Sequence, residues 1–202
     1  MSSKRLDADG FILSGGAARR AGGINKSLMR VEGRAIIEHQ LERLRPLFGD
    51  CITIVTDRPE DFASRGVKCI PDLEIAGVER CALRGVATAL AAPGGAIRFL
   101  LAADMPHPDA RSIRAQCERI HAAGGEVMAS LLKGARGAEP FHGVYRAEAA
   151  GSAIAALKAG ERAMRRWIAS LGAVATLGPA DLGLDPAAID RCLANWNAPP
   201  GP

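Results

Sequence analysis

A glycine-rich and cationic stretch near the start of the chain contains residue types that could do chemistry. Its sequence is LSGGAARRAGGINK, from Leu13 to Lys26, with four glycines and three cations directly behind a short apolar run. Because glycine has no side chain, backbone N–H groups at Gly15 and Gly16 could approach an anion closely. Arg20 and Lys26 could neutralise the charge of that anion. The stretch therefore predicts a phosphate site, with a glycine turn carrying solvated arginines as the alternative.

Two common phosphate-loop motifs do not fit this stretch. A Walker A loop needs glycine directly before its Lys-Ser pair, but Asn25 precedes Lys26 and Ser27. The dinucleotide-binding motif G-x-G-x-x-G needs glycines two positions apart, whereas Gly15 and Gly16 are adjacent. A phosphate site here must therefore be of another kind.

Two aspartates end apolar runs further along the chain. Asp104 follows the run FLLAA, and the carboxyl end of a buried parallel strand is where open α/β sheets bind ligands. Mg²⁺ usually takes one or two carboxylates together with substrate phosphates, so Asp104 is a candidate metal ligand. Asp72, at the end of CIPD, offers a second carboxylate. For both aspartates, a role in starting a turn is the alternative.

The elements that must position these residues alternate between strand and helix. Four short apolar runs are typical of strands buried on both faces: residues 11–15, 51–57, 67–72 and 97–106. Helical patterns lie between them or follow them, at residues 35–48, 83–92 and 108–123. This alternation predicts parallel strands joined by right-handed crossovers.

The second half of the chain continues with less regular patterns. We expect strands at residues 126–133, 140–147 and 173–177, a helix over 149–171 broken near Gly160, and a last helix over 186–195. The fold class is therefore α/β, a three-layer Rossmann-like fold with a mostly parallel central sheet and helices on both faces. Residues 1–9 are expected to form a flexible polar leader, and residues 10–202 a single domain.

Composition excludes several classes of protein. The chain of 202 residues has no apolar run of about 18 residues and no signal-like start, so we expect a soluble, cytoplasmic protein that does not enter a membrane. Its five cysteines are scattered and form no C-x-x-C pair, which argues against disulfide and zinc frameworks. A net charge of +4 with only 4% aromatic residues permits a phosphate-rich ligand but argues against nucleic acid.

The glycine-rich stretch resembles the L-A-G-G-x-x-x-R-x-G-x-x-K signature of the molybdenum cofactor guanylyltransferases. The resemblance implies a nucleotidyltransferase in which Leu13, Ser14, Gly15 and Gly16 hold the nucleotide. Arg20 and Lys26 would be catalytic residues that neutralise its triphosphate. Asn25 departs from the pattern, because aspartate commonly precedes this lysine in the family.

Three further elements match the same family in the same order. Asp104 lies in a D-M-P element whose aspartate binds the metal in the family, so it is expected to be both catalytic and a Mg²⁺ ligand. Asp72 and Gly85 lie in an I-P-D and G-P-L-x-G region that belongs to the nucleotide-binding side. Asn195 and Asn197 match the closing N-x-N-T-P element, near the binding region of the acceptor.

Departures within these elements leave room for variation. Cys81 and Ala82 stand where the family usually has Gly-Pro, which makes the preference for guanine less secure than the reaction type. Ala198 replaces the threonine of the closing element. Arg162, Arg165 and Arg166 could meet an acceptor phosphate, although a solvated helix face is the alternative.

The resemblance implies transfer of GMP from GTP to the terminal phosphate of molybdopterin, with Mg²⁺ as cofactor and release of pyrophosphate. GTP and molybdopterin would be its small-molecule partners, and cofactor-delivering proteins or molybdoenzymes are candidate protein partners of an expected monomer. None of the four histidines is arranged with serine or cysteine in a way that predicts a nucleophilic triad. Two alternatives remain: transfer from CTP or another NTP to molybdopterin or a sugar phosphate, and a non-catalytic adaptor that only binds nucleotide or cofactor.

Overall fold

The protein is built around one seven-stranded sheet. The computed structural model describes residues 5–15 and 25–196. The strands follow one another across the sheet in the order β5 (Lys68–Ile70), β4 (Ile52–Val55), β1 (Asp9–Leu13), β6 (Ile97–Ala102), β8 (Gly137–Arg146), β7 (Ala129–Gly134) and β9 (Val174–Leu177). All neighbouring strands are parallel except for β8, which is antiparallel to both β6 and β7. A separate small ribbon pairs β2 (Arg30–Val31) with β3 (Arg34–Ala35).

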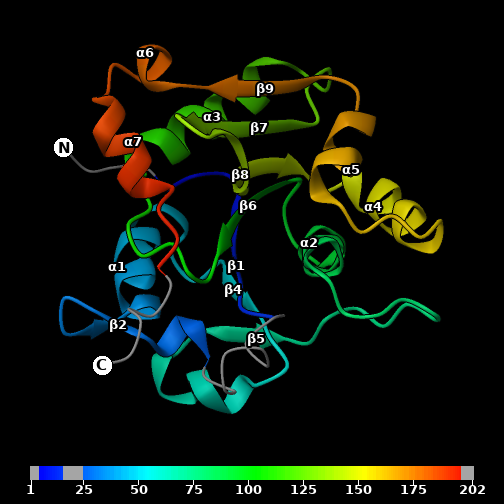
Figure 1. Cartoon of the computed structure of the whole chain (residues 1–202), viewed down its shortest axis with the longest axis horizontal. Coiled ribbons are helices and arrows are strands. Elements are labelled where there is room, and N and C mark those ends of the chain that lie inside the picture. Colours follow the sequence, from blue (N-terminus) through cyan, green and yellow to red (C-terminus); the bar gives the residue numbers. More distant parts are fainter. Residues whose placement is uncertain (1–4, 16–24, 197–202) are drawn as a thin grey trace.

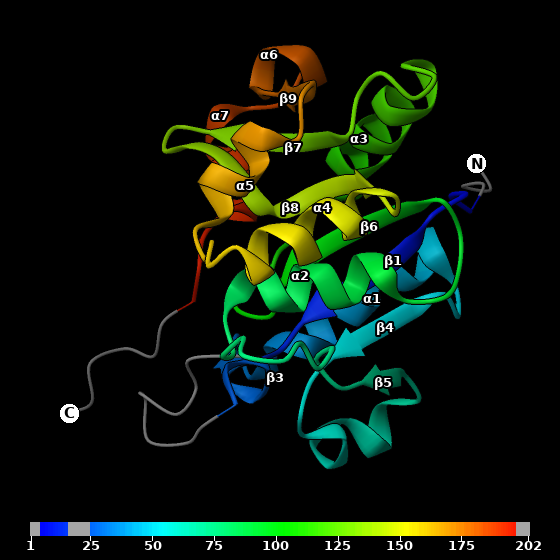
Figure 2. The same cartoon turned by 90° about the vertical axis from the view of Figure 1, so that its right-hand side faces the viewer.

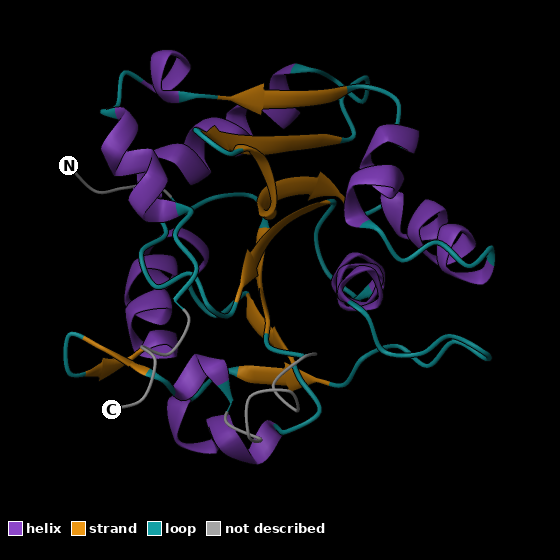
Figure 3. Cartoon of the chain, viewed as in Figure 1, coloured by secondary structure: helices purple, strands orange, loops and turns teal. Residues whose placement is uncertain are grey.

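Helices cover both faces of this sheet, as Figures 1 and 3 show in one view and Figure 2 from the side. One face carries α1 (Ile36–Phe48) and α3 (Ala110–Ala122), and the other carries α2 (Ala82–Ala91), α4 (Ala149–Lys158) and α5 (Met164–Ser170). The short helices α6 (Pro179–Leu182) and α7 (Pro186–Cys192) lie beside β7 and β9. The three-layer α/β fold expected from the sequence is thus confirmed.

Each face of the sheet has its own apolar core. On the α1 side, Phe48 stacks on Phe99 with ring centroids 5.7 Å apart. On the α2 side, Tyr145 stacks on Trp167 at 5.9 Å. The central strands β1, β4 and β6 are therefore buried on both faces over most of their length, which explains why they appear in the sequence as continuous apolar runs.

The order of the strands creates a switch point between β1 and β6. From β1 the chain crosses through α1 to β4 and then to β5 on one side, and returns through α2 to β6 on the other side of β1. After β1 the chain continues toward α1, and after β6 toward α3 on the same face, so both loops leave the same carboxyl edge of the sheet. At the point where the strand order reverses, this edge is where open α/β sheets bind ligands in a crevice.

Several boundaries differ from the expected ones. Strand β1 begins at Asp9, because that carboxylate pairs with Arg98 of β6. Just before it, Ala8 is buried and the Leu6 N–H donates to the Leu47 carbonyl at 2.9 Å, so both residues contact the rest of the domain. The last helix ends at Cys192 instead of residue 195.

The break expected near Gly160 separates α4 from α5, and Gly160 adopts a φ of 87° there. The Arg162 guanidinium donates to the Leu157 carbonyl at 2.8 Å and so satisfies a carbonyl at the end of α4. In the described part of the chain, no helix is long and apolar enough to span a bilayer.

Candidate active site

The turn after β1 lies directly beside the turn after β6. Leu13 pairs with Ala102, and the N–H of Ala103 donates to the Leu13 carbonyl at 3.2 Å. On the other side, the Ser14 N–H donates to the Val55 carbonyl at 2.9 Å. The glycine-rich stretch and the Asp104 turn therefore leave the sheet side by side. Gly16 and Arg20, two residues of the predicted site, lie outside the described residues.

Lys26 and Asp104 meet in this crevice although 78 residues separate them in sequence. The Lys26 Nζ donates to Asp104 Oδ2 at 3.1 Å, and their side chains are 34% and 18% exposed. Lys26 begins the short 3-10 helix η2 (Lys26–Leu28), and Asp104 lies just beyond β6. The fold thus brings together a cation and a carboxylate that two separate motifs had singled out.

The turn that carries Asp104 is held from two directions. The amide of Gln40, which is fully buried on α1, donates to the Ala102 carbonyl at 2.8 Å and to the Met105 carbonyl at 2.9 Å. The Trp196 N–H donates to the Asp104 carbonyl at 2.7 Å, which brings the neighbouring Asn195 to the same turn. Asn197 lies outside the described residues.

Asp72 lies in a small cradle at the end of β5. Its carboxylate is 5% exposed, and Oδ2 accepts a hydrogen bond from Arg80 Nε at 3.0 Å. A Cβ placed on Gly15 would lie 3.5 Å from Asp72 Oδ2, and one on Gly85 would lie 3.7 Å from Oδ1. Among the described residues, Asp72 Oδ1 has no hydrogen-bond partner. Three residues predicted to bind the nucleotide are therefore neighbours around one buried carboxylate.

Arg80 links this cradle to the loop after β4. Its guanidinium also pairs with Asp57, and this hydrogen bond, together with the nearby charges of Asp57 and Asp72, raises the pKa of Arg80. Neither Arg80 nor Asp57 was singled out in the sequence, because nothing in their spacing shows that two loops will converge here.

A groove of about 760 Å³ opens next to the crevice. Its lining comes from the β7–β8 hairpin, α5 and the segment after α7, and includes Arg136, Glu139, Phe141, Met164, Arg165 and Asn195. Burial raises the pKa of Glu139, and the nearby negative charge of Asp104 raises it further, while the Phe141 N–H that it accepts lowers it. The groove therefore approaches Asp104 and carries arginine side chains suited to an anion.

Comparison with known proteins identifies the family. Residues 10–175 match the model of the MobA-like NTP transferase domain. The chain belongs to this family. It is accordingly a nucleotidyltransferase, an enzyme that transfers a nucleotide from an NTP.

Relatives of this NTP transferase cover nearly its whole length. It is 27% identical to a "probable molybdenum cofactor guanylyltransferase" of Opitutus terrae, over 98% of this chain and 95% of that protein. It is 32% identical to the "molybdenum cofactor guanylyltransferase" of Pseudomonas syringae pv. syringae, over 94% and 88% of the two chains. The crystal structure of "molybdopterin-guanine dinucleotide biosynthesis protein A" from Archaeoglobus fulgidus superposes with a TM-score of 0.76 at 24% identity, covering 95% and 93%, which supports the fold.

A metal ion would find few protein ligands in the described part of the NTP transferase. Among the described residues, no group of three His, Cys, Asp or Glu side chains could hold one. One partly exposed carboxylate at Asp104 suits a Mg²⁺ ion whose remaining ligands are phosphate oxygens and water, and it does not suit a metal held by protein alone.

The three arginines considered for an acceptor phosphate have different surroundings in the NTP transferase. Arg165 lines the groove, whereas Arg162 donates to the carbonyls of Leu157 and Glu161, and Arg166 pairs with Glu161 at 2.7 Å. His142 is completely buried, with its ring edge-on to Phe99 at 5.2 Å, so it is a packed core residue.

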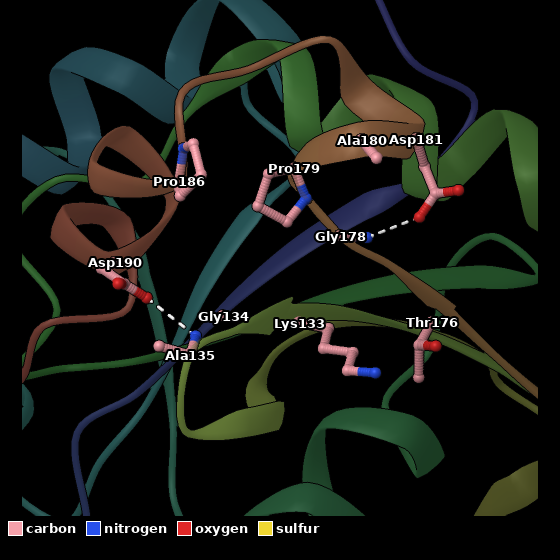
Figure 4. A pocket seen from close by; sticks show the side chains of 10 residues that line it. All are labelled: Lys133, Gly134, Ala135, Thr176, Gly178, Pro179, Ala180, Asp181, Pro186 and Asp190. Carbon is pink, nitrogen blue, oxygen red and sulfur yellow. Dashed lines mark hydrogen bonds between the residues drawn. The ribbon is translucent and has the colours of Figure 1, made fainter.

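A second, smaller pocket of about 360 Å³ lies where β7 and β9 meet α6 and α7 (Figure 4). Its two carboxylates are engaged with backbone: Asp181 accepts the Gly178 N–H at 2.8 Å, and Asp190 accepts the Ala135 N–H at 3.0 Å. The Asp181 bond caps α6 itself, and the Asp190 bond joins α7 to the turn between β7 and β8, so we assign this pocket no ligand.

Gln40 is a residue of the site that sequence reasoning missed. A signal for it exists, because Gln40 interrupts the buried stripe of Ile37, Leu41 and Leu44 with a polar side chain. A polar residue on the inner face of a helix must find partners in the core. Its partners in this protein are the carbonyls that shape the Asp104 turn.

Proposed function

We propose that the protein transfers GMP from GTP to the terminal phosphate of molybdopterin and releases pyrophosphate. Two relatives that it matches over most of their length carry the name molybdenum cofactor guanylyltransferase. The observation that carries the proposal is the contact between Lys26 and Asp104 beside the turn at Gly15, because it joins a cation, a carboxylate and open backbone at one switch point.

The nucleotide would occupy the crevice between β1, β5 and α2. At the end of β1, the backbone of Leu13, Ser14 and Gly15 would contact the nucleotide. Gly16 is assigned the same role by family resemblance. Asp72 Oδ1 is buried and lacks a partner among the described residues, so it is suited to accept a hydrogen bond from the nucleoside. Gly85 leaves space beside that oxygen.

The chemistry asks little of the protein beyond alignment and charge neutralisation. A terminal phosphate oxygen of the acceptor forms a bond to the α-phosphorus of GTP, and the bond from that phosphorus to the bridging β-phosphate oxygen breaks. The acceptor is already an anion, so no strong base is required. Lys26 would neutralise charge as pyrophosphate leaves, with Arg20 assigned the same role by resemblance. Asp104 would hold Mg²⁺, which supplies further charge neutralisation on phosphate oxygens.

The acceptor would occupy the groove next to Asp104. Arg136 and Arg165 offer positive charge to an anionic phosphate, and Asn195 lies at the end of the groove that the Trp196 hydrogen bond joins to Asp104. Asn197 is assigned to the acceptor by resemblance. A volume of about 760 Å³ lies in the range of small-molecule sites.

Pyrophosphate release with four nucleotides tests this function. The protein would be incubated with molybdopterin, Mg²⁺ and GTP, CTP, ATP or UTP in turn, and we expect release to be fastest with GTP. Preference for CTP would support the alternative that Cys81 and Ala82 suggest, namely transfer of another nucleotide. If the protein binds an Mg-NTP tightly but releases no pyrophosphate with any acceptor, it is a non-catalytic adaptor, and the proposal is contradicted.

A further inference from the structure

Asn25, where the family pattern commonly has aspartate, bridges three elements of the crevice. Its Oδ1 accepts the Ser27 N–H at 3.1 Å and the Ser14 hydroxyl at 3.2 Å. Its Nδ2 donates to Asp61 Oδ2 at 2.8 Å. The orientation of the amide is fixed by chemistry, since a backbone N–H must meet the oxygen and a carboxylate must meet the nitrogen.

Asp61 reaches Asn25 from the 3-10 helix η3 (Pro59–Arg65), which follows β4. Its side chain is only 12% exposed; Arg58 Nε lies 3.2 Å from Asp61 Oδ2, and Arg58 Nη2 donates to Asp61 Oδ1 at 3.3 Å. Asp61 is therefore a largely buried carboxylate held by a guanidinium on one side and by the Asn25 amide on the other.

The hydrogen bonds of Asn25 fix the start of η2, and with it the position of Lys26. Asn25 is the N-cap of η2, and Lys26 is the first residue of that helix. The next residue, Ser27, is fully buried and its hydroxyl lies 2.7 Å from the Ser14 hydroxyl at the end of β1. Lys26 is thus fixed at both flanks, and from this position its Nζ reaches Asp104.

We propose that Asn25 and Asp61 form one positioning pair that holds Lys26 for its contact with the triphosphate, an inference that rests on the proposed function. In this chain an amide stands directly before the lysine, and the carboxylate of Asp61 lies one hydrogen bond beyond that amide. An aspartate at position 25 could still accept from Ser27 and Ser14. Its second oxygen, however, would replace the nitrogen that now lies 2.8 Å from Asp61 Oδ2, and two carboxylates would repel each other.

This geometry makes a reciprocal exchange informative. Asn25→Asp should weaken binding of Mg-GTP and lower kcat, together by roughly 10- to 100-fold, the scale for breaking a hydrogen bond to a buried charged group. Asp61→Asn should cost only about 2- to 5-fold, because an amide oxygen can still accept from Asn25. The double variant Asn25→Asp/Asp61→Asn restores one carboxylate and one amide, and should recover to within about 3-fold of the unmodified protein.

The experiment measures three quantities on the full chain. Isothermal titration with Mg-GTP in the absence of acceptor gives binding without turnover, pyrophosphate release gives kcat and KM, and thermal unfolding shows whether each variant is folded. Asp50→Asn, an exposed aspartate before β4 at the opposite end of the sheet, is the matched control and should change none of them. Rescue of binding and kcat by the second substitution, with unfolding temperatures close to that of the unmodified protein, supports the pair.

A double variant no better than Asn25→Asp, or an Asn25→Asp variant that matches the unmodified protein, would overturn the inference. If the unmodified protein binds Mg-GTP but releases no pyrophosphate, the proposed reaction fails while the binding cycle still decides whether the pair exists. If it binds none of the four triphosphates, the positioning role is refuted together with the proposed function.

Discussion

Replacing Lys26 with methionine should move two measurable quantities in opposite directions. The Lys26 ammonium lies 3.1 Å from Asp104 Oδ2. A divalent ion alone must compete with that ammonium for the carboxylate, whereas a triphosphate would draw the ammonium toward its own oxygens. Lys26→Met keeps the apolar stem of the side chain and removes only the charge. Metal binding without nucleotide should therefore become tighter while turnover becomes slower.

The size of each effect follows from exposure. The side chains of Lys26 and Asp104 are 34% and 18% exposed, so solvent screens their ion pair, which contributes about 0.5–1 kcal/mol. In Lys26→Met a metal ion no longer has to break this ion pair to bind Asp104. Affinity for a divalent ion alone should accordingly rise about 2- to 5-fold. Turnover should fall about 10²- to 10³-fold, the scale for losing one preorganised charge in a transition state.

Mn²⁺ makes the first effect measurable, because its free concentration can be followed by electron paramagnetic resonance during a titration. Pyrophosphate release at saturating Mg-GTP gives the second. Lys158→Met, an exposed lysine at the end of α4, is the control and should change neither quantity. Asp104→Asn should weaken Mn²⁺ binding. Unchanged Mn²⁺ affinity together with unchanged turnover in Lys26→Met would refute the assigned roles of both residues.

Three further substitutions probe the frame of the site and the core. Gln40→Leu removes two hydrogen bonds that shape the Asp104 turn, so it should lower the free energy of unfolding by about 1–3 kcal/mol and raise the Mg²⁺ concentration for half-maximal pyrophosphate release. Arg80→Met removes the partner of buried Asp72 and should weaken Mg-GTP binding about tenfold in a calorimetric titration. Burial lowers the pKa of His142 from 6.5 to about 4. As the pH falls below 6.5, the unfolded chain therefore binds a proton that the folded chain does not, which favours unfolding. The free energy of unfolding, measured in urea, should drop by about 3 kcal/mol by pH 4. His142→Phe should remove that part of the pH dependence.

Each of these expectations has a clear contrary result. A Gln40→Leu variant with an unchanged Mg²⁺ titration would show that the turn does not depend on the amide. Full Mg-GTP affinity in Arg80→Met would separate Asp72 from nucleotide binding. Identical acid sensitivity of His142→Phe and the unmodified protein would assign the loss of stability to other groups.

Local patterns in the sequence predict the individual elements well. The helix expected over residues 35–48 is found at Ile36–Phe48, because the offsets of its apolar residues depend only on helix geometry. The placement of Asp72 and Asp104 at strand ends also follows from local runs. These features need no knowledge of which strands become neighbours.

Long-range contacts could not be predicted in the same way. The 3.1 Å contact of Lys26 with Asp104 requires that β6 pair with β1, which is a matter of strand order. The start of β1 at Asp9 depends on Arg98, 89 residues away in sequence. The sequence alone shows Asn25 as a departure from a family pattern, and its compensating partner Asp61 becomes visible only when η3 is folded against η2.

The antiparallel strand β8 explains why the groove that we propose for the acceptor lies next to Asp104. Because β8 runs against β6, with Leu101 paired to His142 and Ile97 to Arg146, the start of β8 lies at the carboxyl end of β6. Glu139 and Phe141, near the start of β8, therefore line a groove beside the Asp104 turn. If β8 ran parallel to β6, its carboxyl end would lie beside that turn instead. The Trp196 N–H then ties the segment after α7 to the Asp104 carbonyl. The sheet's second half thus brings the groove proposed for an anionic acceptor to a carboxylate supplied by the first half, which is the arrangement that the proposed transfer between two bound phosphates requires.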